Sequence, residues 1–200
     1  MRCDYHAGFR IYDYQQAEGI GTHIDAPCHV VENGISIDQL PLNSLIAPGA
    51  MIDISAKVKQ NPDCLLQKQD IQDWEKLNQR QLNDLIVLIY TGWDEYWLQE
   101  SQYRNMDSHG VMHFPGISKA AAHYLSEKKI KGIGIDTLSL DAGISTEYPA
   151  HHIFLSQGIY QIENLTNLRN LPAHSFLVIA LPTKIFKGPE ASARVIALVG

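Results

Sequence analysis

The chain has 200 residues, of which 45% are hydrophobic and 19% are charged, so it contains enough apolar material for a substantial core. This length favours a single domain spanning residues 1–200, because chains tend to divide into domains only beyond about 250 residues. The 16 basic and 22 acidic residues give a formal net charge of -6. A nucleic-acid partner is therefore not expected, because such partners need an excess of basic side chains to contact phosphates.

The cysteines and the apolar runs indicate the compartment. The three cysteines, Cys3, Cys28 and Cys64, form no CxxC pair, which favours a reducing compartment over a disulfide framework. Residues 1–16 lack the apolar stretch of a signal peptide, and runs such as 176–182 are far shorter than the roughly 20 residues that span a bilayer. We therefore expect a cytoplasmic protein with no membrane partner.

Two helices and six short strands can be predicted along the chain. A helix is expected over 68–80, where Ile71, Trp74 and Leu77 recur at three-residue spacing, and another after Ser118, a typical N-cap residue. Runs of β-branched and aliphatic residues predict strands at 51–54, 85–90, 132–135, 159–162, 175–181 and 194–199. This order predicts an α/β or α+β fold in which helices cover a central sheet.

A polar and aromatic segment at 94–114 shows only weak periodicity. We expect it to form a long loop over a pocket, because loops of this length are usually functional or disordered. Trp93, Tyr96 and Trp97 lie near its start, and two interpretations of these residues stay open. They could form an apolar pocket wall or pack in the core.

Residues 19–29 read GIGTHIDAPCH and concentrate side chains that can bind metal ions. If the chain is extended here, His23 and Asp25 point to the same side of the strand, because side-chain direction alternates. A proline then ends the strand, and His29 follows near the same point. Nitrogen and carboxylate donors suit Zn, Mn or Fe(II). Cys28 lies within the motif, but no basic neighbour would activate it, so we expect a packed thiol.

Further candidate ligands lie in residues 149–168, which read PAHHIFLSQGIYQIENLTNL. His151 and His152 follow a proline, and Glu163 closes an apolar strand. A carboxylate in that place is costly to bury unless it is paired or bound to a cation. An exposed strand end would need no such partner, so both interpretations stay open for Glu163.

The segment GTHIDAPCH resembles the HxGTHxDxPxH signature of the cyclase family of metal-dependent hydrolases, which includes bacterial kynurenine formamidases and the related isatin hydrolases. The likeness continues through IKGIGIDTLSLD and LPTKIFKGPEASARVIAL, and it covers nearly the whole chain from about residue 19. The resemblance implies a swivelling β/β/α-type single domain with a central mixed sheet flanked by helices. It also implies one or two divalent ions, Zn or Mn, and a homodimer or larger homo-oligomer.

The resemblance assigns a role to each matching residue. His23 and Asp25 fall on metal ligands of the signature, and the aspartate bridges the ions where two are bound. His29 falls on the histidine that serves as general acid/base. His151 and Glu163 match a histidine and a glutamate ligand that lie twelve residues apart in the family.

One departure from the signature concerns its first histidine, also a metal ligand, which is replaced here by Gly19. Glycine has no side chain to donate, so one metal position loses a ligand. Three outcomes stay open: a single-metal site, a second metal held by water or another residue, or a site that no longer turns over. His6 and His152 are the reserves that could compensate.

The resemblance and the donor set together predict hydrolysis of a small-molecule amide, formamide, or cyclic amide or lactone. A divalent ion can lower the pKa of bound water toward about 7, so that hydroxide attacks the carbonyl at neutral pH. His29 would move the proton to the leaving group. The alternative is a non-catalytic metal- or ligand-binding homologue that lost activity with the histidine at Gly19. Gly19 does not favour a single-Mn hydrolase of the isatin type, because those relatives also use the first histidine.

Overall fold

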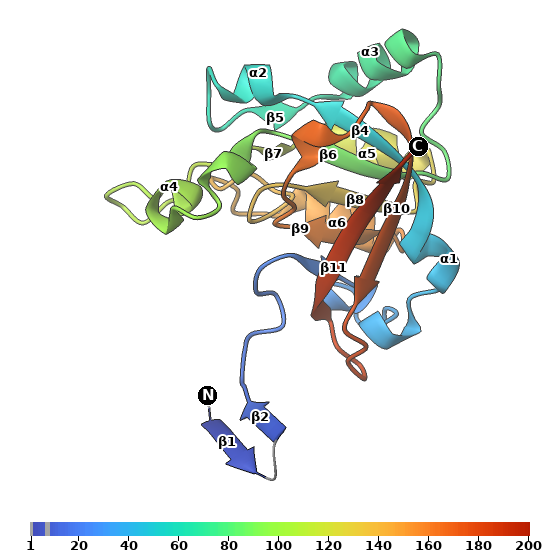
Figure 1. The fold of residues 1–200 in the computed structure, drawn as a ribbon. Helices are drawn as coiled ribbons and strands as arrows, with labels where there is room; N and C mark the ends of the chain where they lie inside the picture. The colour runs from blue at the N-terminus through green and yellow to red at the C-terminus, as the bar shows by residue number, and fades with distance from the viewer. Residues whose placement is uncertain (1, 7–8) are drawn as a thin grey trace.

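The computed structural model describes residues 2–6 and 9–200, and its centre is a closed sheet of seven strands with helices packed outside (Figure 1). The strand order is β10-β11-β3-β9-β8-β6-β4, and β10 pairs with β4 to close the barrel. The neighbours β4, β6, β8 and β9 run parallel, whereas the pairs involving β3, β11 and β10 are antiparallel. The predicted α/β class with a mixed sheet flanked by helices is confirmed.

The strands of the barrel are β3 (His23–Asp25), β4 (Ile46–Asp53), β6 (Ile86–Tyr90), β8 (Gly132–Ile135), β9 (Tyr160–Glu163), β10 (His174–Pro182) and β11 (Glu190–Val199). Two smaller sheets join β1 (Arg2–His6) to β2 (Phe9–Asp13) and β5 (Leu65–Leu66) to β7 (Gly116–Ile117). The α-helices are α1 (Leu42–Leu45), α2 (Ser55–Val58), α3 (Lys68–Asn78), α4 (Glu100–Arg104), α5 (Lys119–Glu127) and α6 (Pro149–Ser156). The short 3-10 helices are η1 (Pro27–His29), η2 (Ile37–Gln39), η3 (Trp93–Tyr96) and η4 (Leu168–Asn170).

Two apolar cores lie on opposite faces of the barrel wall. In β6 every residue is buried, with Ile86 and Leu88 in a cluster that fills the barrel interior. Val87 and Ile89 belong to a second cluster, outside the barrel, with residues of α3, α5 and α6. Because side chains alternate along a strand, a strand covered on both faces must be apolar throughout. This double burial explains why the β6 segment reads as an uninterrupted apolar run.

The predicted helices are confirmed, with one error in the buried face of α3. Ser118 caps α5, and its hydroxyl accepts a hydrogen bond from the backbone N–H of Ala121 at 3.2 Å. In α3, Ile71 and Trp74 are buried, but Leu77 is 83% exposed. Two steps of three residues leave Leu77 about 120° from Ile71 around the helix, because a turn takes about 3.6 residues.

The prediction of one long loop over 94–114 is wrong, because this segment contains α4 and a β-bridge between Met106 and Met112. Trp93 is buried in the outer core, and its indole N–H donates to the carbonyl oxygen of Tyr103 at 2.8 Å. Trp93 and Tyr96 also line a cavity of about 350 Å³. Among the described helices, none is long and apolar enough to span a membrane.

A buried carboxylate connects the carboxyl ends of the parallel strands through hydrogen bonds. Asp136, directly after β8, is fully buried and accepts hydrogen bonds from the backbone N–H groups of Thr91, Gly92 and Trp93 and from the Thr91 hydroxyl. Burial raises the pKa of Asp136 to about 7, against the opposing effect of the hydrogen bonds from Thr91. The phenol of Tyr103 bridges the Asp136 carbonyl to the side chain of Asn164, which follows β9. The network fixes the strand ends beside Glu163.

We predict that Asp136→Ala lowers the free energy of unfolding by about 2–4 kcal/mol, because several buried donors lose their acceptor together. Chemical unfolding followed by circular dichroism measures this change. The matched control is Asp73→Ala, at an exposed aspartate of α3, which should change stability by less than about 0.5 kcal/mol. Equal effects of the two substitutions would contradict the role given to Asp136.

Candidate metal centre

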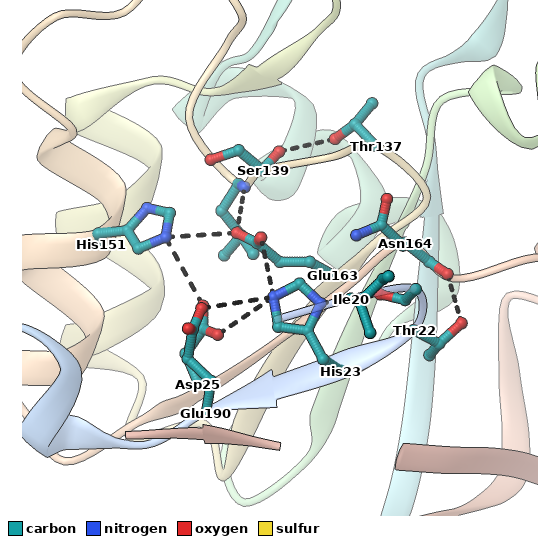
Figure 2. Close-up of polar contacts among 12 residues, drawn as sticks. Ile20, Thr22, His23, Asp25, Thr137, Ser139, His151, Glu163, Asn164 and Glu190 are labelled. Atoms are coloured by element: carbon teal, nitrogen blue, oxygen red, sulfur yellow. Dashed lines mark hydrogen bonds and ion pairs between the residues drawn. The ribbon is translucent and has the colours of Figure 1, made fainter. Parts of the chain in front are cut away.

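Four chain segments bring acidic and imidazole side chains together outside the barrel wall (Figure 2). Ile24 in β3 and Ile162 in β9 belong to the interior core, so the alternating residues His23, Asp25 and Glu163 point outward. The pairing register places His23 opposite Glu163 and Asp25 opposite Glu190 of β11. Helix α6 packs against this outer face and supplies His151.

The four predicted ligand residues converge on one buried point. The His23 Nε2 atom lies 3.3 Å from Asp25 Oδ1 and 3.4 Å from Glu163 Oε2. The His151 Nε2 atom lies 3.3 Å from Glu163 Oε1 and 3.6 Å from Asp25 Oδ2. All four side chains are buried. The structure therefore brings together residues that the sequence places far apart, whereas their role as metal ligands stays a prediction.

Hydrogen bonds outside the group fix the orientation of both imidazoles. The Nδ1 atom of His23 lies 2.8 Å from the carbonyl oxygen of Gly21, and that of His151 lies 2.7 Å from Asp141 Oδ2. Both partners accept hydrogen bonds, so in the neutral form of each ring Nδ1 carries the proton and the Nε2 lone pair faces the centre. Glu163 is held in turn by the backbone N–H of Leu140 at 3.0 Å.

The carboxylate of Asp25 provides the test of whether these residues fit a metal ion. Both of its oxygens are buried, and neither has a hydrogen-bond partner among the described residues. Leaving such a group unpaired costs free energy, whereas a cation between the donor atoms would satisfy it. The donors fall into two groups, and Asp25 belongs to both. The first group is His23, Asp25 and Glu190, and the second is Asp25, His151 and Glu163. Within each group the ligand atoms lie within 4.8 Å of one another. The residues fit one or two divalent ions.

The electrostatics of the group also favour a cation. Burial lowers the pKa of both imidazoles, but Asp25 and Glu163 outweigh it and raise the pKa of His23 to about 11. Asp141, Asp25 and Glu163 likewise raise the pKa of His151 to about 12. The pKa of Asp25 is lowered, because its contacts with the two histidines outweigh its own burial. The group therefore stabilises positive charge in a buried place, as protons or as a metal ion.

A cavity of about 430 Å³ opens onto this group. His29, on η1, is exposed at the cavity, and its ring centroid lies 6.0 Å from that of His151. His152 is exposed and lines the cavity, but it belongs to neither donor group. The lining residues are Gly19, His23, His29, Val30, Leu138, Ser139, Tyr148, His151, His152, Glu163 and Glu190.

Three other sequence predictions have separate outcomes. The side chain of His6, a reserve ligand, lies outside the described residues. Trp93 and Tyr96 line a different cavity, which shares no residue with this one, and Trp97 lines neither. Cys28 is half-buried with its Sγ 3.7 Å from the carbonyl oxygen of Gly188, and burial raises the pKa of its thiol. These contacts agree with a packed thiol.

Sequence reasoning missed two carboxylates of this centre, Asp141 and Glu190. Asp141 accepts hydrogen bonds from the backbone N–H groups of Ala150 and His151 at the start of α6, besides its contact with the imidazole. The available signal was Pro149, a residue typical of the first helical turn, which indicates a helix that needs an acceptor at its N-terminus. For Glu190, the available signal was indirect: the signature has a metal-ligating histidine where this chain has Gly19, so a ligand was missing.

Comparisons with known proteins agree with this fold. The Cyclase family model, described as "Putative cyclase", matches residues 4–142. Isatin hydrolase from Roseibium aggregatum is 35% identical over 91% of this chain and 72% of its own length. Kynurenine formamidase from Salinibacter ruber is 31% identical over 88% of this chain and 74% of its own.

Solved structures extend the similarity to three dimensions. Isatin hydrolase A from Labrenzia aggregata, bound to benzyl benzoate, superposes with a TM-score of 0.90 and 33% identity over 99% of this chain and 82% of its own. A predicted metal-dependent hydrolase from Bacillus stearothermophilus gives a TM-score of 0.74 and 27% identity over 98% of this chain and 84% of its own. The chain therefore belongs to the cyclase family, as the signature predicted.

We predict that Asp141→Asn weakens the binding of Mn²⁺ or Zn²⁺ about 10- to 100-fold, as is typical when the partner of a ligating histidine is lost. An amide N–H facing His151 favours the tautomer that carries its proton on Nε2, which can no longer bind a metal. The remaining side-chain oxygen can still accept from the N–H of Ala150. Isothermal titration with the metal tests the affinity, and thermal unfolding of the metal-free variant checks the fold. An unchanged affinity would show that Asp141 has no orienting role.

Proposed function

We propose that this protein is a metal-dependent hydrolase that cleaves the C–N bond of a small amide, formamide or cyclic amide, or the corresponding bond of a lactone. The observation that carries the proposal is the buried carboxylate of Asp25, whose two oxygens have no hydrogen-bond partner among the described residues and face the Nε2 atoms of His23 and His151. The relatives named isatin hydrolase and kynurenine formamidase support this substrate class. Isatin is a cyclic amide, and the second name indicates a formamide.

His23, Asp25, His151 and Glu163 would hold one or two ions, and their mixed nitrogen and oxygen donors suit Zn or Mn. A divalent ion bound there would supply water activation at neutral pH and would stabilise negative charge developing on the carbonyl oxygen. The four side chains are buried, and the Glu163 carboxylate contacts both imidazoles.

His29 is the proposed general acid/base. Its ring lies at the cavity beside His151, and its exposed position leaves it free to contact a bound substrate. The imidazole of His29 would accept a proton from the attacking water and donate it to the leaving nitrogen or oxygen. One side chain therefore serves both halves of the reaction.

The cavity walls favour a small substrate with an apolar or aromatic part. Val30, Leu138 and Tyr148 line the cavity together with the polar centre. A volume of about 430 Å³ is within the range of small-molecule sites, and apolar walls around a few polar groups are typical of them.

We further propose that the protein is cytoplasmic and that it forms a homodimer or a larger homo-oligomer. The outer face of β11 supports the assembly, because Ile196 and Leu198 are 45% and 54% exposed on the same side of the strand.

We predict that His29→Ala lowers turnover about 10²- to 10⁴-fold, the range typical of a lost general acid/base, while the bound metal stays unchanged. Turnover is measured with isatin, N-formylkynurenine and a panel of cyclic amides and lactones. His152→Ala is the matched control, since His152 lines the same cavity without belonging to either donor group. Bound metal with no hydrolysis of any compound by the unaltered protein would instead favour the non-catalytic alternative.

We predict that Asp25→Ala abolishes high-affinity metal binding together with hydrolysis, because Asp25 belongs to both donor groups. Elemental analysis of the purified protein and of the variant measures the ions per chain. Circular dichroism confirms that the variant folds. If the variant retained the metal content of the unaltered protein, the proposed centre would be wrong.

A further inference from the structure

The space beside Gly19 is filled by another side chain of the same centre. A β-carbon at residue 19 would lie 2.7 Å from Glu190 Oε1, closer than real β-carbons approach other atoms, and 3.1 Å from Glu190 Cδ, a tight contact. The backbone of Gly19 lies outside the left-handed region, so a side chain there would meet no backbone strain and would only have to displace the flexible end of Glu190. The Glu190 carboxylate therefore occupies the place where a side chain at residue 19 would begin.

Glu190 is also placed as a ligand would be. It is the first residue of β11 and lies opposite Asp25 in the antiparallel pair with β3. Its Oε1 atom lies 3.8 Å from His23 Nε2, and Figure 2 shows its side chain beside that of Asp25. Among the described residues, its carboxylate accepts no hydrogen bond, and its ion pair is with the imidazole of His23. Nothing else in the described structure explains why this acidic group points into the centre.

The charge of Glu190 adds to this argument. Its side chain is only 25% exposed and lies close to the carboxylate of Asp25. Two carboxylates so close together in a largely buried place are unfavourable unless a cation lies between them. A divalent ion among the three donors would reverse this cost.

We propose that Glu190 replaces the ligand that is missing at Gly19 and completes a second metal position with His23 and Asp25. The inference rests on the proposed function, because the same centre holds both positions. Asp25 then bridges this position and the one formed with His151 and Glu163. Exchange of an imidazole for a carboxylate makes the position richer in oxygen donors, which suits Mn²⁺. The chain binds two Mn²⁺ ions despite the glycine in its signature.

Glu190→Gln tests this inference, because it keeps the size of the side chain and removes its charge. Titration calorimetry with Mn²⁺ should give two ions per chain for the unaltered protein and one for the variant, with the second ion bound at least about 100-fold more weakly. Electron paramagnetic resonance should show a coupled Mn²⁺ pair in the first and an isolated Mn²⁺ in the second. Glu147→Gln, at an exposed glutamate near the start of α6, is the matched control and should retain both ions.

A rescue experiment tests the exchange of positions directly. The double variant Gly19→His with Glu190→Ala should regain the second ion, because the imidazole can occupy the space that the carboxylate leaves. Gly19→His alone should not improve binding, because the new side chain and Glu190 compete for the same space. Failure of the double variant to regain the ion would count against the exchange.

The outcomes separate this inference from the proposed function. If the unaltered protein binds Mn²⁺ and Glu190→Gln changes neither the number of ions nor their affinity, the inference is wrong and the metal centre stands. If the unaltered protein binds neither Mn²⁺ nor Zn²⁺, both are wrong. Retention of a coupled Mn²⁺ pair by the Glu190→Gln variant would also overturn the inference.

Discussion

The register of β3 between its two antiparallel neighbours is the constraint on which the centre depends. Three short segments meet there, with His23 opposite Glu163 and Asp25 opposite Glu190. A slip of one residue would exchange the two faces of β3 and turn Ile24 outward. The fully buried Ile24, Ile162 and Ala191, which pack inside the barrel, prevent that slip. Apolar packing on one face thus sets the geometry of the polar groups on the other.

The second constraint is the cost of burying several carboxylates together. Asp25, Asp141, Glu163 and Glu190 contact only His23 and His151 in the ion pairs of the described residues, and no lysine or arginine reaches them. Neutral imidazoles leave this negative charge uncompensated, so the folded state needs a bound cation or protonated histidines. An ion that binds only the folded chain also stabilises it, in proportion to the logarithm of its concentration over its dissociation constant. The centre therefore couples folding to metal binding.

The local part of this centre could be predicted from the sequence, because it follows from one strand. Alternation along an extended chain was sufficient to place His23 and Asp25 on one side. His151 and Glu163 were paired through the family resemblance, since α6 was not predicted and the direction of His151 depends on that helix. The apolar spacing that suggested Leu77 as a core residue failed because three-residue steps drift around a helix.

Glu190 could not be placed for a different reason. The predicted strand began at residue 194, four residues after β11 begins, because its first residues follow Gly188 and Pro189 and carry no aliphatic run. Its partner on β3 lies near the other end of the chain, and no local pattern reports a pairing of that range. The missing donor at Gly19 was visible, but a missing group identifies no substitute. Only the tertiary structure shows which side chain fills the space.

The place of a ligand in the fold also affects the chemistry of the ion that it holds. A donor at residue 19 would stand in a turn before β3, whereas Glu190 stands on a strand paired directly with Asp25. Sites built on strands hold their ligands more precisely than sites built on loops. The extra negative charge attracts a cation more strongly than a neutral imidazole does, but it also makes the ion a weaker Lewis acid. With Glu190 as a ligand, the centre therefore binds the ion more tightly but activates water less strongly. The proton transfers assigned to His29 become correspondingly more important.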